Sequence, residues 1–387
     1  MKILFFNYEY PPLGGGAGNA TFYILKELSK ITDLEIDLIT SSPDEKYREE
    51  KIGDNIRIYK LPIGKNEKNL HFQSQKDLLV YAWKAYFFAR KLIRRLAEEN
   101  TKYDLSHSFF GVPCGFISYC LKRRFKIPYI VSLRGADVPG YSERFPAIYF
   151  ILKPLIRRIW SNADFVVSNS QGLKDLAIKT NCRQEIGIIP NGIDTSQFKP
   201  HLEASLPSND FKILCVSRIT ERKGIKYLIE AMKYLPEIIT LEIVGEGNEK
   251  EKLEKLAENL KLKNRIKFLG LISHEKLPEI YQSAYVFVLP SLNEGMSNTI
   301  LEALAAGLPI IATDTGGTKE LLRDGENGFI IQMKNAKNIA EKIEKLMADD
   351  TLRKNMSLVS RKKAESLSWK NVADKYLSLY EKIYPIK

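Results

Sequence analysis

Residues 286–307, VFVLPSLNEGMSNTILEALAAG, carry the strongest structural signal in this chain. The apolar run at 286–289 predicts a buried strand, and the apolar spacing at 299–306 predicts a helix. Glu294 lies in the loop between them and Glu302 lies in the expected helix. A buried strand, a loop and a helix in this order form one unit of a parallel sheet that helices cover on both faces.

The same alternation runs through both halves of the chain. Short apolar runs predict strands at 3–7, 35–40, 56–61, 129–133, 165–168, 186–189, 212–216, 240–244, 266–269, 286–289 and 309–312. Helical spacing separates them at 21–31, 77–99, 146–160, 173–179, 224–234, 249–260, 299–306 and 336–348. The pattern predicts an α/β protein with two doubly wound, Rossmann-like domains that face each other across a cleft. We expect these domains at 1–198 and 211–368, with a hinge at 199–210 where prolines and serines gather.

Length and composition narrow the class of protein. The chain has 387 residues, 44% of them hydrophobic and 27% charged, which fits two domains and excludes a disordered or fibrous protein. No apolar run approaches the roughly 20 residues that span a bilayer, and the apolar N-terminal stretch is too short for a signal peptide. The chain has four cysteines, Cys114, Cys120, Cys182 and Cys215, and no two of them form a CxxC pair. Neither a zinc site nor a disulfide framework is therefore expected. We therefore expect a reduced, cytoplasmic protein.

The net charge of +12 is unevenly distributed. Residues 84–158 alone hold 15 basic and 5 acidic side chains, which predicts an anionic partner such as an acidic membrane surface, a phosphorylated acceptor or nucleic acid. The expected helices at 77–99 and 146–160 mix aromatic and basic residues, as helices at a membrane interface do. Packing helices with solvated basic faces are the alternative. Nucleic acid is not expected, because no recognition motif accompanies the charge.

A glycine-rich turn, PPLGGGAGN at 11–19, follows the first expected strand. Gly15 and Gly16 let the backbone approach a ligand, and the N-terminus of the next helix attracts anions. The turn is not GxGxxG, because Asn19 replaces the last glycine, and the strand at 35–40 ends in Thr40 instead of an acidic residue. An NAD-dependent dehydrogenase is therefore disfavoured. A flexible turn without a ligand is the alternative.

A basic turn, SRITERKG at 217–224, follows the first expected strand of the second domain. Arg218 offers a planar fork to phosphate oxygens, and Lys223 offers a mobile point charge. At a helix start, these two cations suit a diphosphate. An exposed basic loop without a ligand would have the same sequence pattern.

Two acids bracket the start of the helix expected at 299–306. If the intervening residues were all helical, Glu294 and Glu302 would lie about 12 Å apart, which is the scale of a bound nucleotide sugar. Backbone N–H groups at a helix N-terminus suit phosphate and sugar oxygens, and here they come from Gly295, Met296, Ser297, Asn298 and Thr299. Burying Glu302 unpaired is costly, so we expect sugar and ribose hydroxyls to satisfy both acids.

These motifs resemble those of the retaining glycosyltransferases of family 4 (group 1), which have the GT-B fold. Glu294 and Glu302 match the E-x7-E element of that family, and Arg218 and Lys223 match its basic element. Further segments that fit are IPNGID at 189–194, VGEG at 244–247, FLG at 268–270, ATDTGG at 312–317 and NGF at 327–329. The resemblance covers nearly the whole chain and is most specific in the second domain.

The resemblance implies transfer of a sugar from a nucleotide-diphosphate sugar to a hydroxyl acceptor, in the synthesis of a glycan, a glycolipid or a cell-envelope polysaccharide. UDP is the expected nucleotide, with GDP open, and the anomeric configuration would be retained. Arg218 and Lys223 would hold the diphosphate and stabilise the leaving charge. Glu294 would bind the donor sugar and Glu302 the ribose. Further donor contacts are implied for Gly15, Gly16, Gly245, Leu269 and the N–H groups of 295–299.

The resemblance also implies that no metal or other cofactor is needed. The C-terminal segment 369–387, which has an amphipathic helical pattern, is expected to pack back on the first domain.

One position departs from the family pattern. Relatives often carry a histidine after the strand expected here at 129–133, whereas this chain has Arg134. Arg134 would bind donor phosphate or acceptor, and Asp137 would contact the donor sugar or the acceptor hydroxyl; an Arg–Asp pair that holds the loop is the alternative. His107, at another expected strand end, lines the cleft or is structural. The other histidines, His71, His201 and His274, belong to no comparable pattern.

Two further functions fit the same architecture. A nucleotide-sugar epimerase or a phosphorylase is one, although no lysine motif for a pyridoxal cofactor is present. A non-catalytic nucleotide-sugar binder is the other, and it predicts donor binding without transfer. For the transferase, we expect a cytoplasmic location with peripheral contact at the inner membrane face through residues 84–158.

Overall fold

The computed structural model describes residues 1–65, 70, 73–141, 146–181, 183–200 and 211–384. The chain forms two compact units, unit 1 from residues 1–191 with 369–387, and unit 2 from residues 192–368. The first unit thus gives way to the second at Asn191, seven residues before the boundary expected at 198. Most of the expected hinge, at 201–210, lies outside the described residues, as do His71, Cys182 and His201.

Unit 1 contains an eight-stranded sheet with the order β3-β4-β2-β1-β5-β6-β7-β8. The strands are β1 (Lys2–Phe6), β2 (Glu35–Ser41), β3 (Arg48–Ile52), β4 (Ile56–Leu61), β5 (Leu105–Phe109), β6 (Tyr129–Leu133), β7 (Phe165–Ser168) and β8 (Gly187–Ile188). Strand β3 pairs antiparallel with β4, and the other described pairs in this sheet are parallel.

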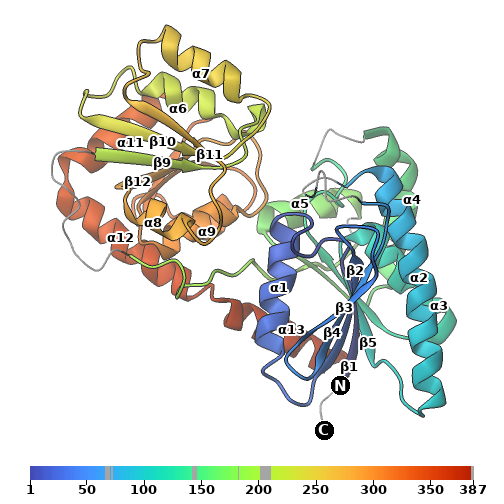
Figure 1. The fold of residues 1–387 in the computed structure, drawn as a ribbon. Coiled ribbons are helices and arrows are strands. Elements are labelled where there is room, and N and C mark those ends of the chain that lie inside the picture. Colours follow the sequence, from blue (N-terminus) through green and yellow to red (C-terminus); the bar gives the residue numbers. More distant parts are fainter. Residues whose placement is uncertain (66–69, 71–72, 142–145, 182, 201–210, 385–387) are drawn as a thin grey trace. The chain divides into compact units, whose positions relative to one another are not determined.

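Helices cover both faces of this sheet (Figure 1). On one face lie α2 (Gln75–Glu98), α3 (Phe116–Phe125) and α4 (Pro146–Asn162), and on the other lie α1 (Gly16–Leu28) and α13 (Trp369–Ile383). A fifth helix of the N-terminal segment, α5 (Gln171–Thr180), follows β7. The C-terminal helix α13 therefore belongs to unit 1, where its apolar side packs against α1.

The sequence predicted a strand end at His107 but gave no range for that strand, which is β5. Its sequence, LSHSF, lacks an apolar run, yet all five residues are buried between β1 and β6. Hydroxyl groups make this possible, because Ser106 and Ser108 both bond to the Ser118 hydroxyl of α3, at 2.9 and 2.8 Å. Buried polar groups are tolerated when they are bonded in this way.

Unit 2 contains a six-stranded parallel sheet with the order β11-β10-β9-β12-β13-β14. Its strands are β9 (Phe211–Val216), β10 (Ile239–Val244), β11 (Ile266–Gly270), β12 (Val286–Leu289), β13 (Ile310–Thr313) and β14 (Gly328–Ile331). Its helices are α6 (Ile225–Ala231), α7 (Lys250–Asn259), α8 (Leu277–Gln282), α9 (Asn298–Ala305), α10 (Thr318–Leu321), α11 (Ala336–Ala348) and α12 (Asp350–Glu365), with a short 3-10 turn at Glu221–Lys223.

Both sheets reverse their strand order once. In unit 1 the reversal lies between β1 and β5, and in unit 2 it lies between β9 and β12. Ligands of doubly wound sheets bind at the carboxyl ends of the strands on either side of such a switch point. The loops after β1, β5, β9 and β12 are therefore where a site is expected. Among the helices described, none is both long and apolar enough to cross a membrane.

Candidate active site

An ion pair lies at the switch point of unit 2. Lys223 comes from the turn after β9 and Glu294 from the loop after β12, and the Lys223 ammonium contacts Oε1 of Glu294. The side chains are 12% and 10% exposed, so water screens the pair weakly. The hydroxyl of Ser291 donates to the same carboxylate oxygen at 3.0 Å. The sheet thus joins the predicted basic turn to the predicted acidic loop.

Close backbone contacts hold these loops together. Gly245, after β10, has a φ of +135°, and a Cβ there would lie 1.9 Å from the carbonyl oxygen of Ser217. Gly316, after β13, has a φ of +50°, and a Cβ there would lie 1.9 Å from the carbonyl oxygen of Glu294. Side chains at either position would push the loops apart. Both glycines therefore support the position of the loops that carry the charged groups.

Arg218 lies in the same turn after β9 as Lys223, and its side chain is exposed to solvent. Helix α9 begins at Asn298, with the Ser297 hydroxyl as its N-cap, accepting from the N–H of Ile300 at 3.4 Å. Glu294 therefore lies in the loop before the helix, as the sequence predicted, and the separation of about 12 Å, which assumed helix throughout, does not apply. The helix N-terminus follows the Glu294 loop directly and carries a partial positive charge.

Glu302 is buried and bonded to protein groups. The Tyr281 hydroxyl of α8 donates to Oε2 of Glu302 at 2.8 Å, and Nε2 of His274 lies 3.7 Å from Oε1. The burial of Glu302 therefore needs no sugar hydroxyl to explain it, contrary to the argument from sequence. A ribose contact of Glu302 stays a prediction.

His274 has a partner that the sequence analysis missed. A hydrogen bond to Glu302 raises the pKa of the imidazole, and burial opposes this shift. His274 lies in the loop after β11, so the rule that strand ends carry functional groups could have flagged it. Leu269 and Gly270 close the same strand, and the Gly270 carbonyl accepts from the N–H of Gly245 at 2.8 Å.

The glycine turn of unit 1 follows β1. Gly15 and Gly16 are exposed at the start of α1, and a Cβ at Gly15 would meet no atom within 4 Å. The backbone there is open to a ligand. The Glu9 carboxylate accepts from the N–H of Gly15 at 3.4 Å, so an anion at this position would displace or repel that acid.

Arg134 and Asp137 follow β6, and each has a different task. Asp137 accepts from the backbone N–H groups of Gly111, Arg134 and Gly135 at 2.7, 2.9 and 3.0 Å, and thereby ties the loop after β6 to the loop after β5. Burial nevertheless raises the pKa of Asp137. The loop is held by backbone bonds to Asp137 and not by a side-chain Arg–Asp pair.

The Arg134 guanidinium stacks on a ring and keeps donor capacity. Its carbon lies 3.8 Å from the ring centre of Phe109, and Nη1 donates to Oδ1 of Asn191 at 3.2 Å. Nη2 is buried and has no hydrogen-bond partner within the described part of the chain. An unmet guanidinium donor suits an oxygen-bearing ligand.

His107 lies within β5 and not at a strand end. The ring is fully buried, with Nδ1 2.8 Å from the hydroxyl of Tyr380 and Nε2 2.7 Å from the hydroxyl of Ser132. Burial holds its pKa well below the usual 6.5. With no exposed surface to offer a substrate, His107 is a structural residue here, and we leave it out of the candidate site.

The other residue types give no further candidate. Cys114, Cys120 and Cys215 are free thiols. Over the residues that the structure describes, no three or more His, Cys, Asp or Glu side chains gather as a metal-binding group would require.

Comparison with known proteins identifies the architecture and the family. One solved structure, sucrose-phosphate synthase from Thermosynechococcus elongatus, matches with a TM-score of 0.84 at 22% identity and covers 99% of both chains. Another, HepE of Anabaena in complex with UDP, matches with a TM-score of 0.75 at 19% identity, covering 99% of this chain and 100% of that one. The fold, two parallel Rossmann-like sheets with helices, is thus the GT-B fold of glycosyltransferases.

Sequence relatives agree with this class. The family model described as Glycosyltransferase Family 4 matches residues 14–197, and the model described as Glycosyl transferases group 1 matches residues 198–363. An uncharacterized glycosyltransferase of Methanocaldococcus jannaschii is 26% identical over 389 residues, which cover 99% of each protein. The chain belongs to glycosyltransferase family 4, group 1, and is a sugar-transferring enzyme.

Proposed function

We propose that this protein is a retaining glycosyltransferase that moves a sugar from a UDP-sugar to a hydroxyl acceptor in the synthesis of a glycan, a glycolipid or a cell-envelope polysaccharide. The observation that carries the proposal is the ion pair of Lys223 and Glu294 at the switch point of unit 2. The choice of UDP is supported by the HepE structure, whose fold this chain shares and which is described as a complex with UDP.

Each charged group then has a role in the reaction. The ion pair fixes the position of the Lys223 ammonium, and the exposed Arg218 adds a second cation for the diphosphate. The bond between the anomeric carbon and the diphosphate oxygen breaks, and its electron pair leaves with the diphosphate. The acceptor oxygen bonds to the same face of that carbon, and its proton ends on the diphosphate. Glu294 orients the sugar hydroxyls, and no metal or other cofactor is required.

Unit 1 supplies the acceptor side in this proposal. The unmet Nη2 of Arg134 binds an acceptor oxygen, and replacing Arg134 with Ala should lower kcat/KM about tenfold to a hundredfold, as loss of a charged hydrogen bond does. Replacing Arg134 with Lys should restore little, because an ammonium lacks the planar fork that stacks on Phe109. The protein acts in the cytoplasm, in peripheral contact with an anionic membrane through residues 84–158.

A panel of nucleotide sugars tests the donor. The preferred donor should raise the melting temperature of the full chain, because it binds only the folded state. Lys223→Ala and Glu294→Gln should each abolish transfer from labelled donor, and Arg218→Ala should weaken donor binding. Lys226→Ala is the matched control, since Lys226 is an exposed cation three residues on that pairs only with Glu230 on its own helix among the described side chains. Unchanged transfer in both Lys223→Ala and Glu294→Gln would refute the site.

Two measurements separate the alternatives. NMR of the product should show the anomeric configuration of the donor; an inverted product would refute retention. Donor binding without any transfer or hydrolysis would favour a non-catalytic binder, and a new nucleotide sugar formed without acceptor would favour an epimerase.

A further inference from the structure

Helix α2 presents an apolar stripe to solvent. Leu79, Trp83 and Phe87 are 72%, 64% and 47% exposed, although large hydrophobic side chains at three successive i, i+4 positions usually face a core. The opposite side of the helix, with Tyr81, Ala85 and Ala89, is the side that packs on the unit 1 core. The exposed residues are therefore a second apolar face, separate from the one that folding buries.

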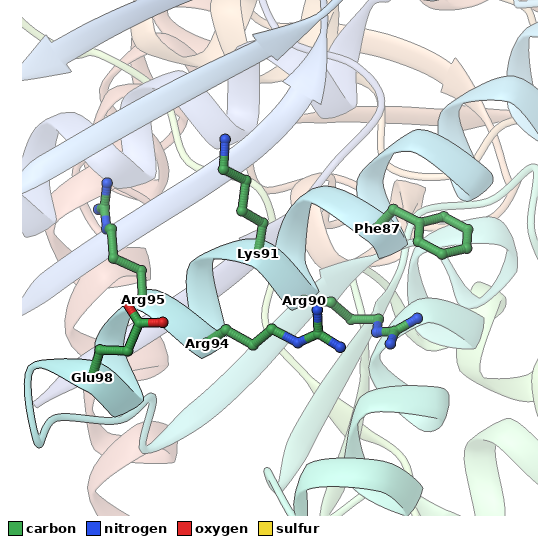
Figure 2. Close-up of a pocket in the computed structure, with 6 residues that line it drawn as sticks. All are labelled: Phe87, Arg90, Lys91, Arg94, Arg95 and Glu98. Atoms are coloured by element: carbon green, nitrogen blue, oxygen red, sulfur yellow. The ribbon is translucent and has the colours of Figure 1, made fainter.

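Basic residues continue the same face toward the C-terminal end of α2. At 100° per residue, Leu79, Trp83, Phe87, Arg90 and Arg94 fall within an arc of about 80°. Figure 2 shows the Arg90 and Arg94 guanidinium groups on one side of the helix beyond Phe87. An open pocket of about 530 Å³ is lined here by Phe87, Arg90, Lys91, Arg94, Arg95 and Glu98.

Among the cations that line this pocket, Arg95 lies 4.0 Å from Glu99, and the other three form no ion pair with any acid that the structure describes. Arg90 lies over the rings of Tyr86 and Phe87, at 5.6 and 5.5 Å from their centres. The guanidinium therefore lies among aromatic rings and still has donors for an anion.

The neighbouring helices extend the positive surface. Helix α2 has six basic and two acidic residues, while α3 and α4 have three basic residues each and no acidic one, a net charge of +10 over the three. The three helices cover the same face of the unit 1 sheet (Figure 1). A second copy of this chain docked through the same face would bring two such charges together.

We propose that this face of α2 binds an anionic lipid bilayer, with Leu79, Trp83 and Phe87 inserted among the acyl chains and Arg90 and Arg94 at the lipid phosphates. A tryptophan at the interface, apolar residues on one side and adjoining cations are the features of helices that lie in a membrane surface. The helix is fitted for this, because it is about 36 Å long and its start is fixed by a capping box of Ser74 and Asp77. This inference narrows the membrane contact to one helix face and does not depend on the donor or the acceptor.

Sedimentation of the full chain with vesicles tests the proposal. The protein should bind vesicles of equimolar phosphatidylglycerol and phosphatidylcholine, and should bind pure phosphatidylcholine much more weakly. Replacing Arg90 and Arg94 together with Gln should lower the partition coefficient about thirtyfold. Replacing Trp83 with Ser should lower it about tenfold and should also reduce the part of the binding that survives high salt.

Matched controls guard against general effects of charge and polarity. Leu358→Ser removes an apolar side chain that is 71% exposed on α12 of unit 2, and Lys252→Gln with Lys263→Gln removes two exposed cations of unit 2. Both should leave vesicle binding within twofold of the parent protein. Lys223→Ala should bind vesicles normally, so loss of the membrane contact and loss of catalysis are distinguishable.

Two results would overturn the proposal. The first is equal binding of the Trp83→Ser and Arg90→Gln/Arg94→Gln proteins and their parent. The second is a dimer in solution that Trp83→Ser dissociates while vesicle binding persists, which would assign the face to a second copy of the chain.

Discussion

The ion pair of Lys223 and Glu294 permits a quantitative test of the candidate site. In Lys223→Met, the Glu294 carboxylate keeps the Ser291 hydroxyl but loses its cation while only 10% of the side chain is exposed. Breaking a fully buried pair costs about 3–5 kcal/mol, so this partly hydrated one should lose about 2–3 kcal/mol of unfolding free energy. In Glu294→Gln, the flexible ammonium can reach water, and the loss should be about 1–2 kcal/mol.

The double variant removes both charges at once. No uncompensated ion is left, so its cost should be less than the two single costs added together, by about 1–2 kcal/mol. Lys212→Met is a control from the same sheet. The Lys212 ammonium lies 3.2 Å from Oε1 of Glu242, and this ion pair is remote from the switch point. Lys212→Met should lower the stability of unit 2 and leave nucleotide-sugar binding intact. Lys223→Met should lower the stability of unit 2 and also abolish nucleotide-sugar binding.

The assay must report on unit 2. All three tryptophans, Trp83, Trp160 and Trp369, belong to unit 1, so tryptophan fluorescence would follow the wrong unit. Amide hydrogen exchange in peptides from 211–368 gives the local opening free energy directly. Additive effects of the two single substitutions, within about 0.3 kcal/mol, would refute the reasoning that these side chains form one buried unit.

Three further predictions follow from the packing and the titrating groups. Gly245→Ala should destabilise unit 2 by more than about 2 kcal/mol in the same exchange assay, whereas Gly15→Ala should change unit 1 by less than about 0.5 kcal/mol, because Gly245, unlike Gly15, combines a positive φ with a backbone clash. Burial lowers the pKa of His107, so below pH 6.5 the imidazole binds a proton in the unfolded chain but stays neutral in the folded one. Urea unfolding followed by tryptophan fluorescence should therefore show that unit 1 loses stability as pH falls below 6.5. His107→Gln should reduce this dependence of stability on pH. The hydrogen bond to Glu302 raises the pKa of His274. The contribution of His274 to the stability of unit 2 should therefore be complete below pH 6.5 and be lost as pH rises through the raised pKa. Equal hydrogen-exchange profiles for the parent and His274→Gln across this pH range would contradict this prediction.

The parts of the site that lie within one motif could be predicted from the sequence. Lys223 and Glu294 were both identified from the residue types that follow an apolar strand. Their contact could not be predicted, because they are 71 residues apart and meet only through the pairing of β9 with β12. Strand order is a property of the whole sheet and leaves no local pattern in the chain.

Other failures have a different physical cause. No strand range was assigned to β5, because its polar side chains are satisfied by hydroxyl groups of other elements and burial left no apolar run in the sequence. Ser118 of α3 bonds its two serines, and Ser132 of β6 and Tyr380 of α13 bond His107. The surroundings of Glu302 were misjudged for a similar reason. Its partner Tyr281 lies 21 residues earlier on another helix, and the tyrosine looks like an ordinary apolar residue in sequence. Predictions from periodicity fail where polar side chains pair at long range.

The place of α13 has a consequence for synthesis of the protein. Unit 1 needs Tyr380 to complete the bonding of His107, but that residue follows the whole of unit 2 in the chain. Unit 2 is one uninterrupted segment and is fully synthesised before it. The hydrogen bonding around His107 therefore cannot be completed before unit 2 has been synthesised. Unit 1 thus depends on a segment beyond unit 2, so the two units cannot be completed strictly one after the other from the N-terminus.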